Sequence, residues 1–203
     1  MINLVKSEVC FGKDVDSARR VEVAGWLGVR HVVCHEKYLG LPTFTGRSKK
    51  DLFAFIKDRV WKKVRGWNNS IFLGAGKEIL TKAVIQALPS HAMACFKLPK
   101  SMIRDLHRFI ANFWWGSNNG KSKLHWSKWG SMCLGKEYGG MSFRDLGCFN
   151  QALLAKQGWR IIRNPNSLVG HVLKASYFPR SSFLLAKKGS NASFIWRSIL
   201  WGR

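Results

Sequence analysis

Residues 48–67 read SKKDLFAFIKDRVWKKVRGW, and their apolar positions recur at the intervals of an α-helix. A shared spacing of three or four residues places them on one side of that helix; they are Leu52, Phe55, Ile56, Val60, Val64 and Trp67. Ser48 is placed to cap the N-terminus. This segment begins the helical part of the chain and favours a mainly α (α+β) fold.

Further helices follow downstream of this segment. We predict them over 77–88, 99–116, 150–162, 167–177 and 194–201. The first should end at Pro89 and bury Leu80, Ala83, Val84, Ala87 and Leu88, and the second should bury Met102, Ile103, Leu106, Ile110 and Phe113. Between them, residues 116–146 are rich in loops, and residues 180–191 are predicted to be flexible.

The first 46 residues favour strands and turns around one helix. Short apolar runs at 2–5 and 9–11 precede a helix predicted over 15–26, with Asp14 as its N-cap. Two more strands are expected, at 29–33 and at 38–42, the latter stopping at a proline. We therefore divide the chain into a β-containing region (1–46), a helical region (47–116) and a basic, Trp-rich helical region (117–203).

The charge of the chain is strongly unbalanced. Its 203 residues include 34 Lys and Arg against 11 Asp and Glu, a formal net charge of +23. Such an excess destabilises a compact state unless counter-charge is supplied, and nucleic acid is a common polyanionic partner. Asp145 is the last acid, and nine basic residues follow it. A solvated basic surface without a partner is the competing interpretation.

The helix at 48–67 combines cations with aromatic rings. Phe53, Lys57, Trp61 and Arg65 follow one another at intervals of one turn, and Lys50, Lys62 and Lys63 flank this row. Cations neutralise phosphates and exposed rings stack on bases, so this row is a candidate nucleic-acid contact, which Lys77 and Lys82 extend. Alternatively, the two rings pack against a neighbouring element while the lysines face water.

Other classes of function find little support in the residues. No uninterrupted apolar run is long enough for a transmembrane helix, and the N-terminus lacks a secretory signal. Five scattered cysteines form no CxxC pair and favour a reduced, intracellular protein. His125, Cys133 and Cys148 have spacings that match no tight pair of zinc ligands, so no metal site is predicted. Motifs of nucleophilic catalysis and phosphate-binding loops are absent.

A series of short blocks resembles one known family. Residues 37–42 read KYLGLP, and the blocks downstream are Trp61 to Trp67, LGAGK (73–77), LP at 88–89 and at 98–99, FWWG (113–116), HW (125–126), GGMSFRDL (139–146), NQALLAKQGWR (150–160) and FIWRSI (194–199). In this order they resemble the C-terminal part of plant LINE-type (non-LTR) retrotransposon reverse transcriptases. The second half of the chain is also similar to a short plant mitochondrial open reading frame.

This resemblance implies a role for each region. Lys6 occupies the place of a palm lysine near the nucleotide phosphates, where it could act as a general acid. Tyr38 and Gly40 fall in a block similar to the primer-grip hairpin, and the helices from 48 to 113 resemble the thumb that follows the template–primer backbone. The aspartate pair that holds two Mg²⁺ ions in the family would lie upstream of position 1, and no Asp-Asp pair occurs here.

From these residues we expect a chain that binds the backbone of RNA or DNA and has no polymerase activity by itself. We expect no cofactor, no membrane partner and no small-molecule substrate. Two alternatives stay open, a retroelement relic without function and a structural helical protein. The location is expected to be intracellular, with nucleus, cytoplasm and mitochondrion undecided.

Overall fold

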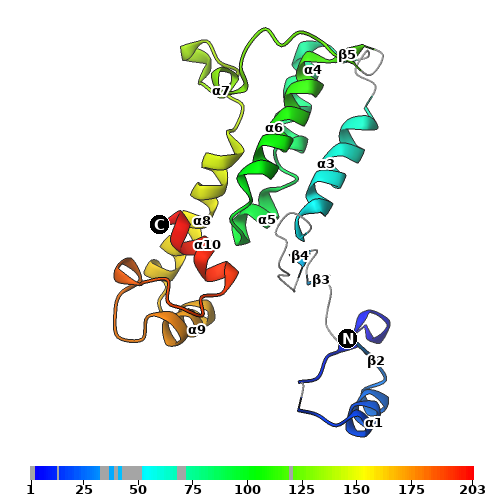
Figure 1. The fold of residues 1–203 in the computed structure, drawn as a ribbon, viewed down its shortest axis with the longest axis vertical. Coiled ribbons are helices and arrows are strands. Elements are labelled where there is room, and N and C mark those ends of the chain that lie inside the picture. Colours follow the sequence, from blue (N-terminus) through cyan, green and yellow to red (C-terminus); the bar gives the residue numbers. More distant parts are fainter. Residues whose placement is uncertain are drawn as a thin grey trace. The chain divides into compact units, whose positions relative to one another are not determined.

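The computed structural model describes residues 3–12, 14–32, 37–38, 41–42, 52–67, 72–118 and 121–203. It is mainly helical, which confirms the predicted fold class (Figure 1). The chain divides into two compact units, residues 1–48 and residues 49–203, called unit 1 and unit 2 below. The functional division of the chain into 1–46, 47–116 and 117–203 stays a prediction.

In the part of unit 1 that the structure describes, helix α1 lies in sequence between two short paired strands. A 3-10 turn, η1 (Leu4–Lys6), precedes strand β1 (Glu8–Val9), helix α1 (Ser17–Leu27) and strand β2 (Arg30–His31). The strands pair in parallel, with Glu8 opposite Arg30. The α1 cap is Asp16, whose carboxylate accepts from the Ala18 amide at 3.2 Å, so the prediction of Asp14 as the cap is wrong.

The KYLGLP block contributes two strands instead of the one expected over 38–42. Strand β3 (Lys37–Tyr38) pairs antiparallel with β4 (Leu41–Pro42), with Tyr38 opposite Leu41. The expectation of one continuous strand is therefore wrong, because its two ends pair with each other. An antiparallel pair is what the resemblance to a hairpin implied.

Unit 2 begins with three helices that lie side by side (Figure 1). They are α3 (Ala54–Arg65), α4 (Gly74–Ile79) with its continuation η2 (Leu80–Ile85), and α6 (Lys100–Trp115). The Trp67 ring, just after α3, packs on Phe113 near the end of α6 with centroids 5.4 Å apart. Because Lys57 meets Asp105 roughly two to three turns earlier on both helices, α3 and α6 run in the same direction. Ser48, the predicted cap of the first helix, lies outside the described residues.

The stretch η2 is a π-helix, which changes the predicted buried face. Here the Gln86 amide donates to the Thr81 carbonyl, five residues back, at 3.0 Å. The wider turn rotates the following residues, so Thr81, Ile85 and Gln86 are fully buried while Ala83 and Ala87 are exposed. The face predicted from a 3.6-residue period is therefore wrong.

Pro89 precedes a short helix that the sequence did not indicate, α5 (Ser90–Cys95). Pro99 then stands at the N-cap of α6, and Gly116 ends that helix with φ 86°. The predicted burial of Met102, Leu106, Ile110 and Phe113 on α6 is confirmed, and Ile103 is only half-buried.

A loop-rich segment follows α6, as predicted. Strands β5 (Ser117–Asn118) and β6 (Lys121–Ser122) pair antiparallel, and they are followed by the single-turn helix α7 (Trp129–Met132) and the 3-10 turn η3 (Lys136–Tyr138).

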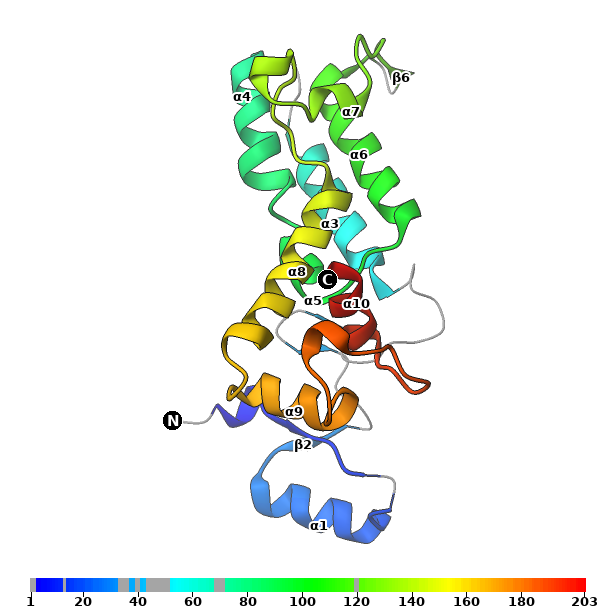
Figure 2. The same ribbon diagram turned by 90° about the vertical axis from the view of Figure 1, so that its left-hand side faces the viewer.

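The C-terminal part of unit 2 contains α8 (Leu146–Arg163), α9 (Leu168–Tyr177), the 3-10 turn η4 (Phe183–Leu185) and α10 (Phe194–Gly202). The three predicted helices are confirmed, and α10 lies against α8 (Figure 2). Their N-caps are Asp145, Ser167 and Ser193, whose side chains each accept a backbone amide hydrogen bond. None of the helices in the described ranges is long and apolar enough to cross a membrane.

Trp196 is the centre of the core in this part. Its side chain is fully buried, and its ring stacks on Tyr177 at 4.8 Å and on Phe178 at 5.6 Å. Phe183 meets the same indole edge-on at 6.0 Å. Residues 183–186, within the stretch predicted to be flexible, are thus anchored in the core, and that prediction is wrong for them.

Two glycines allow the close approach of this core to α8. A Cβ on Gly202 would lie 2.5 Å from the Ala155 amide nitrogen, and one on Gly158 would lie 2.9 Å from the Phe183 ring. Asn150, fully buried on α8, adds polar contacts to the α5 region. Its amide donates to the carbonyls of Met93 (2.8 Å) and Phe96 (2.9 Å), and its oxygen accepts from the Leu98 amide (2.9 Å).

Candidate nucleic-acid interface

The α3 helix, where the sequence predicted a row of cations and aromatic rings, has one side in the core of unit 2. Ile56 and Val60 are buried on this side, as predicted. Phe53 is also fully buried, with its ring 5.6 Å from that of Phe96 and 6.2 Å from that of Phe194. Phe53 is therefore a core residue and not a platform for bases, which confirms the packing alternative for this ring.

Lys57, the next member of the row, connects α3 to α6. Its ammonium lies 3.1 Å from the Asp105 carboxylate and 5.7 Å from the centroid of the Phe109 ring. Both side chains of the ion pair stay partly exposed, so the pair contributes little net stability. The carboxylate nevertheless neutralises Lys57 locally and reduces its value as a phosphate contact.

The C-terminal turn of α3 exposes the rest of the predicted row. Trp61 is 40% exposed, and the Arg65 guanidinium lies over its ring at 4.0 Å. Lys62 and Lys63 on the same turn are exposed. Cations in a last turn also interact favourably with the helix dipole, which alone would explain part of this pattern. A cation stacked on a half-exposed indole is in addition a suitable surface for a nucleic-acid strand.

Helix α6 adds basic residues that the sequence interpretation did not single out. Lys100, Arg104 and Arg108 are all exposed and are spaced by four residues, about 6 Å apart along the axis. This row was visible in the sequence as a basic residue on every turn. Because α6 packs on α3, its row and the exposed C-terminal turn of α3 lie on adjacent helices. We call Lys62, Lys63, Arg65, Lys100, Arg104 and Arg108 the α3–α6 basic surface.

Lys77 and Lys82, predicted to extend this surface, have partners inside unit 2. The Lys77 ammonium donates to the Trp114 carbonyl at 3.5 Å, near the end of α6. Lys82 binds Glu78 at 2.6 Å, and Lys136 binds the same carboxylate at 3.2 Å. Hydrogen bonds from Lys82 and then Lys136 lower the pKa of Glu78. Both predicted residues thus have partners within unit 2, and neither belongs to the exposed set above.

Four other predicted contact residues cannot be placed in a site. Gly40 and Lys50 lie outside the described residues, and for Lys6 and Tyr38 the structure describes the backbone alone. Lys6 is in η1 and Tyr38 is in β3 of unit 1. Their roles in binding stay predictions.

Among the described residues of unit 2, His107 and Cys133 are partly buried titratable groups that both interact electrostatically with Asp145. Burial lowers the pKa of His107, partly offset by Asp145, and the Nε2 atom of its ring accepts from the Leu146 amide at 3.0 Å. Burial raises the pKa of Cys133 to about 11, with Asp145 and Cys148 adding to the effect. Among the described residues, no three His, Cys, Asp or Glu side chains gather closely enough to hold a metal ion.

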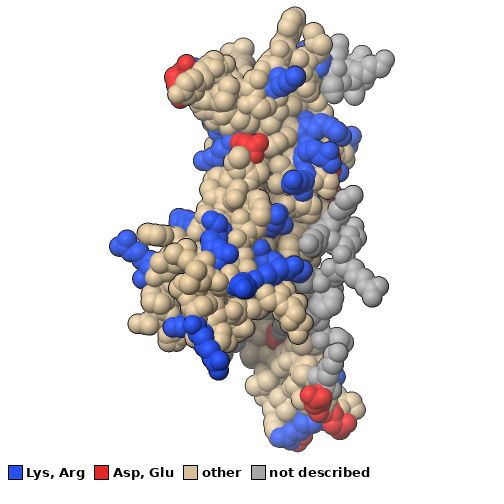
Figure 3. All heavy atoms as spheres, turned by 60° about the vertical axis from the view of Figure 1, so that its left-hand side comes forward, with Lys and Arg blue, Asp and Glu red and all other residues tan. Residues whose placement is uncertain are grey.

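Basic side chains outnumber acidic ones on the part of the surface formed by unit 2. Figure 3 shows one face of the molecule, where Lys and Arg far outnumber Asp and Glu over the helical part. By sequence, unit 2 contains 27 of the 34 basic residues and 6 of the 11 acids.

Comparison with known proteins supplies a family. The chain is 48% identical over 118 residues to an uncharacterized mitochondrial protein of Arabidopsis thaliana. The matched region covers 58% of this chain and 77% of that protein. This chain belongs to the family of that mitochondrial protein.

A second relative is a longer protein. This chain is 38% identical over 165 residues to an Arabidopsis thaliana protein named "Putative ribonuclease H protein". The match covers 80% of the chain but 26% of that protein, so the chain corresponds to about a quarter of it. No family model matches the chain, and no solved structure matches it.

Proposed function

We propose that this chain is a reverse-transcriptase-like piece of a plant non-LTR retroelement that binds the phosphate backbone of an RNA–DNA or DNA duplex through unit 2. The observation that carries the proposal is the α3–α6 basic surface, six exposed cations on two adjacent helices. The order of the sequence blocks supports the thumb-like assignment of these helices. The relation to a protein named for ribonuclease H, an activity on RNA–DNA hybrids, supports a retroelement origin.

The charge balance of unit 2 supports an anionic partner. With 27 basic residues and 6 acids it carries a formal charge of +21, and self-repulsion of this size favours association with a polyanion. Lys57, Lys77 and Lys82 are engaged within the protein. The surface cations therefore are the contacts on which binding depends.

The test is fluorescence anisotropy with a labelled RNA–DNA duplex over a salt series from about 50 to 200 mM, where counterion release makes phosphate binding steep. The variant is Lys62→Glu/Lys63→Glu/Arg65→Glu, which leaves the Lys57–Asp105 pair intact. We expect weaker binding and a salt slope smaller by about three.

The matched control is Lys156→Glu/Arg163→Glu/Lys174→Glu, which changes the charge equally at exposed positions of α8 and α9. If the control weakens duplex binding as much as the α3 variant does, the effect is one of total charge and the proposed surface is refuted. If the unmodified chain ignores the duplex at low salt, the chain has no nucleic-acid function and is a relic or a structural protein.

We propose further that the chain alone neither extends a primer nor cleaves an RNA–DNA hybrid. Both reactions need carboxylates that hold two metal ions around a phosphate, and among the described residues no three His, Cys, Asp or Glu side chains gather closely enough to hold one. Incubation with a primed template, nucleotides and Mg²⁺ should give no extension and no cleavage of the RNA strand. Synthesis that persists after repurification would overturn this part of the proposal.

A further inference from the structure

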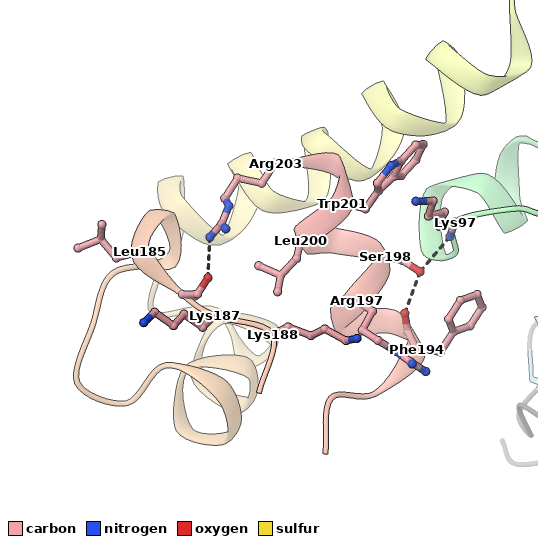
Figure 4. Close-up of a pocket in the computed structure, with 11 residues that line it drawn as sticks. Lys97, Leu185, Lys187, Lys188, Phe194, Arg197, Ser198, Leu200, Trp201 and Arg203 are labelled. Atoms are coloured by element: carbon pink, nitrogen blue, oxygen red, sulfur yellow. Dashed lines mark hydrogen bonds between the residues drawn. The ribbon is translucent and has the colours of Figure 1, made fainter. Parts of the chain in front are cut away.

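A pocket of about 560 Å³ lies between α10 and the segment after η4 in unit 2 (Figure 4). Five of its lining residues are basic, and no acidic residue lines it; the cations are Lys97, Lys187, Lys188, Arg197 and Arg203. This volume is in the range of small-ligand sites. The pocket is distinct from the α3–α6 basic surface, since it shares no residue with it.

Two of the five cations, Arg203 and Lys97, are oriented by neighbouring groups of unit 2. The Arg203 guanidinium donates to the carbonyls of Phe183 (3.0 Å), Leu184 (3.0 Å) and Ala186 (2.8 Å). The Lys97 ammonium lies 4.2 Å from the centroid of the Trp201 ring. The carbonyl dipoles orient the Arg203 guanidinium without neutralising its charge.

The backbone beside Lys97 is also fixed to α10. The Lys97 amide donates to the Ser198 hydroxyl at 2.9 Å, and this hydroxyl donates to the Phe194 carbonyl at 2.8 Å. Ser198 is fully buried, so the α10 wall of the pocket is built on a satisfied polar contact.

The other three cations are exposed and come from both sides of the pocket. Figure 4 shows Lys187 and Lys188 on the segment after η4, and Arg197, Leu200 and Trp201 on α10, with the Lys188 side chain extending toward Arg197 in this view. No Asp or Glu occurs in the sequence after Asp145, so the segments that carry these side chains supply no acidic side chain.

We propose that this pocket binds the sugar–phosphate backbone of a single nucleic-acid strand, an inference that rests on the proposed nucleic-acid binding of unit 2. The pocket combines cations for phosphates with an aromatic ring, the pattern found in single-strand sites. A duplex is too wide to enter a pocket of this size, whereas one nucleotide unit fits. The protein therefore binds duplex and single strand at different places.

The experiment compares two probes on three proteins by fluorescence anisotropy at fixed low salt. The probes are a labelled oligouridylate of about 12 nucleotides, which has no stable secondary structure, and the RNA–DNA duplex used above. The proteins are the unmodified chain, the pocket variant Lys187→Gln/Lys188→Gln/Arg197→Gln and the surface variant Lys62→Gln/Lys63→Gln/Arg65→Gln. Both variants lose three exposed charges, and circular dichroism with thermal melting verifies that both stay folded.

We expect the pocket variant to bind oligouridylate about tenfold or more weakly and the duplex within a few-fold of the unmodified chain, with the reverse for the surface variant. Equal affinity of the pocket variant and the unmodified chain for oligouridylate, with duplex binding still weakened in the surface variant, overturns the pocket alone. If the unmodified chain binds neither probe, the proposed function itself is overturned.

A competition arm separates a strand from a free nucleotide as the source of the phosphates. Unlabelled ATP should displace oligouridylate poorly, because one nucleotide reaches fewer of the cations than a strand does. If isothermal titration shows ATP binding that the pocket variant loses, while oligouridylate affinity is the same in both proteins, the pocket is a free-nucleotide site and the strand proposal is wrong.

Discussion

Units 1 and 2 differ both in net charge and in the burial of their apolar side chains. Unit 1 has 7 basic and 5 acidic residues, whereas unit 2 has 27 and 6. Helix α1 of unit 1 has no buried residue, and Val21, Trp26 and Leu27 are each more than half exposed. Unit 2 instead surrounds Trp196 and α6 with closed packing. Among the described residues, the buried apolar side chains all belong to the strongly charged unit, where their burial offsets the repulsion among its cations.

The largest expected change in stability comes from replacing the buried Trp196 of unit 2, with the exposed Trp26 of unit 1 as the comparison. Trp196→Ala should lower the free energy of unfolding by about 3–5 kcal/mol, because it removes a fully buried indole and leaves a cavity. Trp26→Ala should change it by less than about 0.5 kcal/mol, because the side chain is 68% exposed. Urea unfolding followed by circular dichroism measures both. Similar losses for the two variants would mean that unit 1 has a core of its own.

The next largest change in stability is expected from the buried polar contacts that α8 makes in the core of unit 2. Asn150→Ala leaves the Leu98 amide and two carbonyls without partners, and each unsatisfied group costs about 1–3 kcal/mol. Gln151→Ala, the neighbour on α8, removes one long, exposed contact to the Trp201 carbonyl and should change stability by less than about 0.5 kcal/mol. The same denaturant titration compares them. If both variants are equally stable, Asn150 does not tie α8 to the α5 region.

A smaller effect depends on pH. In the folded protein His107 Nε2 accepts a hydrogen bond from the Leu146 amide, and burial lowers the His107 pKa. As the pH falls, His107 is therefore protonated in the unfolded chain before it is protonated in the folded protein. The free energy of unfolding should therefore fall as pH drops below about 6.5, the ordinary value for histidine, and level off below the folded pKa. His107→Gln should remove this part of the pH dependence. Urea midpoints between pH 7 and 5 that shift equally in both proteins would exclude His107 as the cause.

The sequence predicted local features of the fold well and distant ones poorly. The helices at 150–162, 167–177 and 194–201 are predicted within a few residues because helical periodicity is a local property of the sequence. Helix α5 was missed because Pro89 was interpreted only as a terminator. The π-helical stretch was missed because its period differs from the one assumed. Residues 183–186 are held by Arg203 and Trp196, which no local pattern reveals.

In the candidate interface, too, local features were predictable from the sequence and contacts between distant residues were not. The exposed basic turn of α3 followed from helical spacing in the sequence. The partners of Lys57 and Lys77 lie 48 and 37 residues away, so their engagement became evident only in the structure. A cation in a basic sequence is thus free to bind phosphate only if the fold leaves it without an acid or carbonyl, and local spacing does not report this.

The smallest effect concerns thiol reactivity, which compares the two units without changing their stability. The thiolate is the reactive form, and a pKa of about 11 leaves Cys133 in unit 2 with about one thiolate in a thousand at pH 8. Burial also raises the pKa of Cys95, and Asp145 raises that of Cys148. Cys10 in unit 1 is exposed. In a Cys34→Ser background, iodoacetamide at pH 8 should therefore modify Cys10 first and Cys133 last, as followed by peptide mass spectrometry. Denaturant should equalise the rates, because it removes both burial and the fixed carboxylate; Cys133 reacting as fast as Cys10 in the folded protein would show that unit 2 opens around α7 and does not keep its core closed.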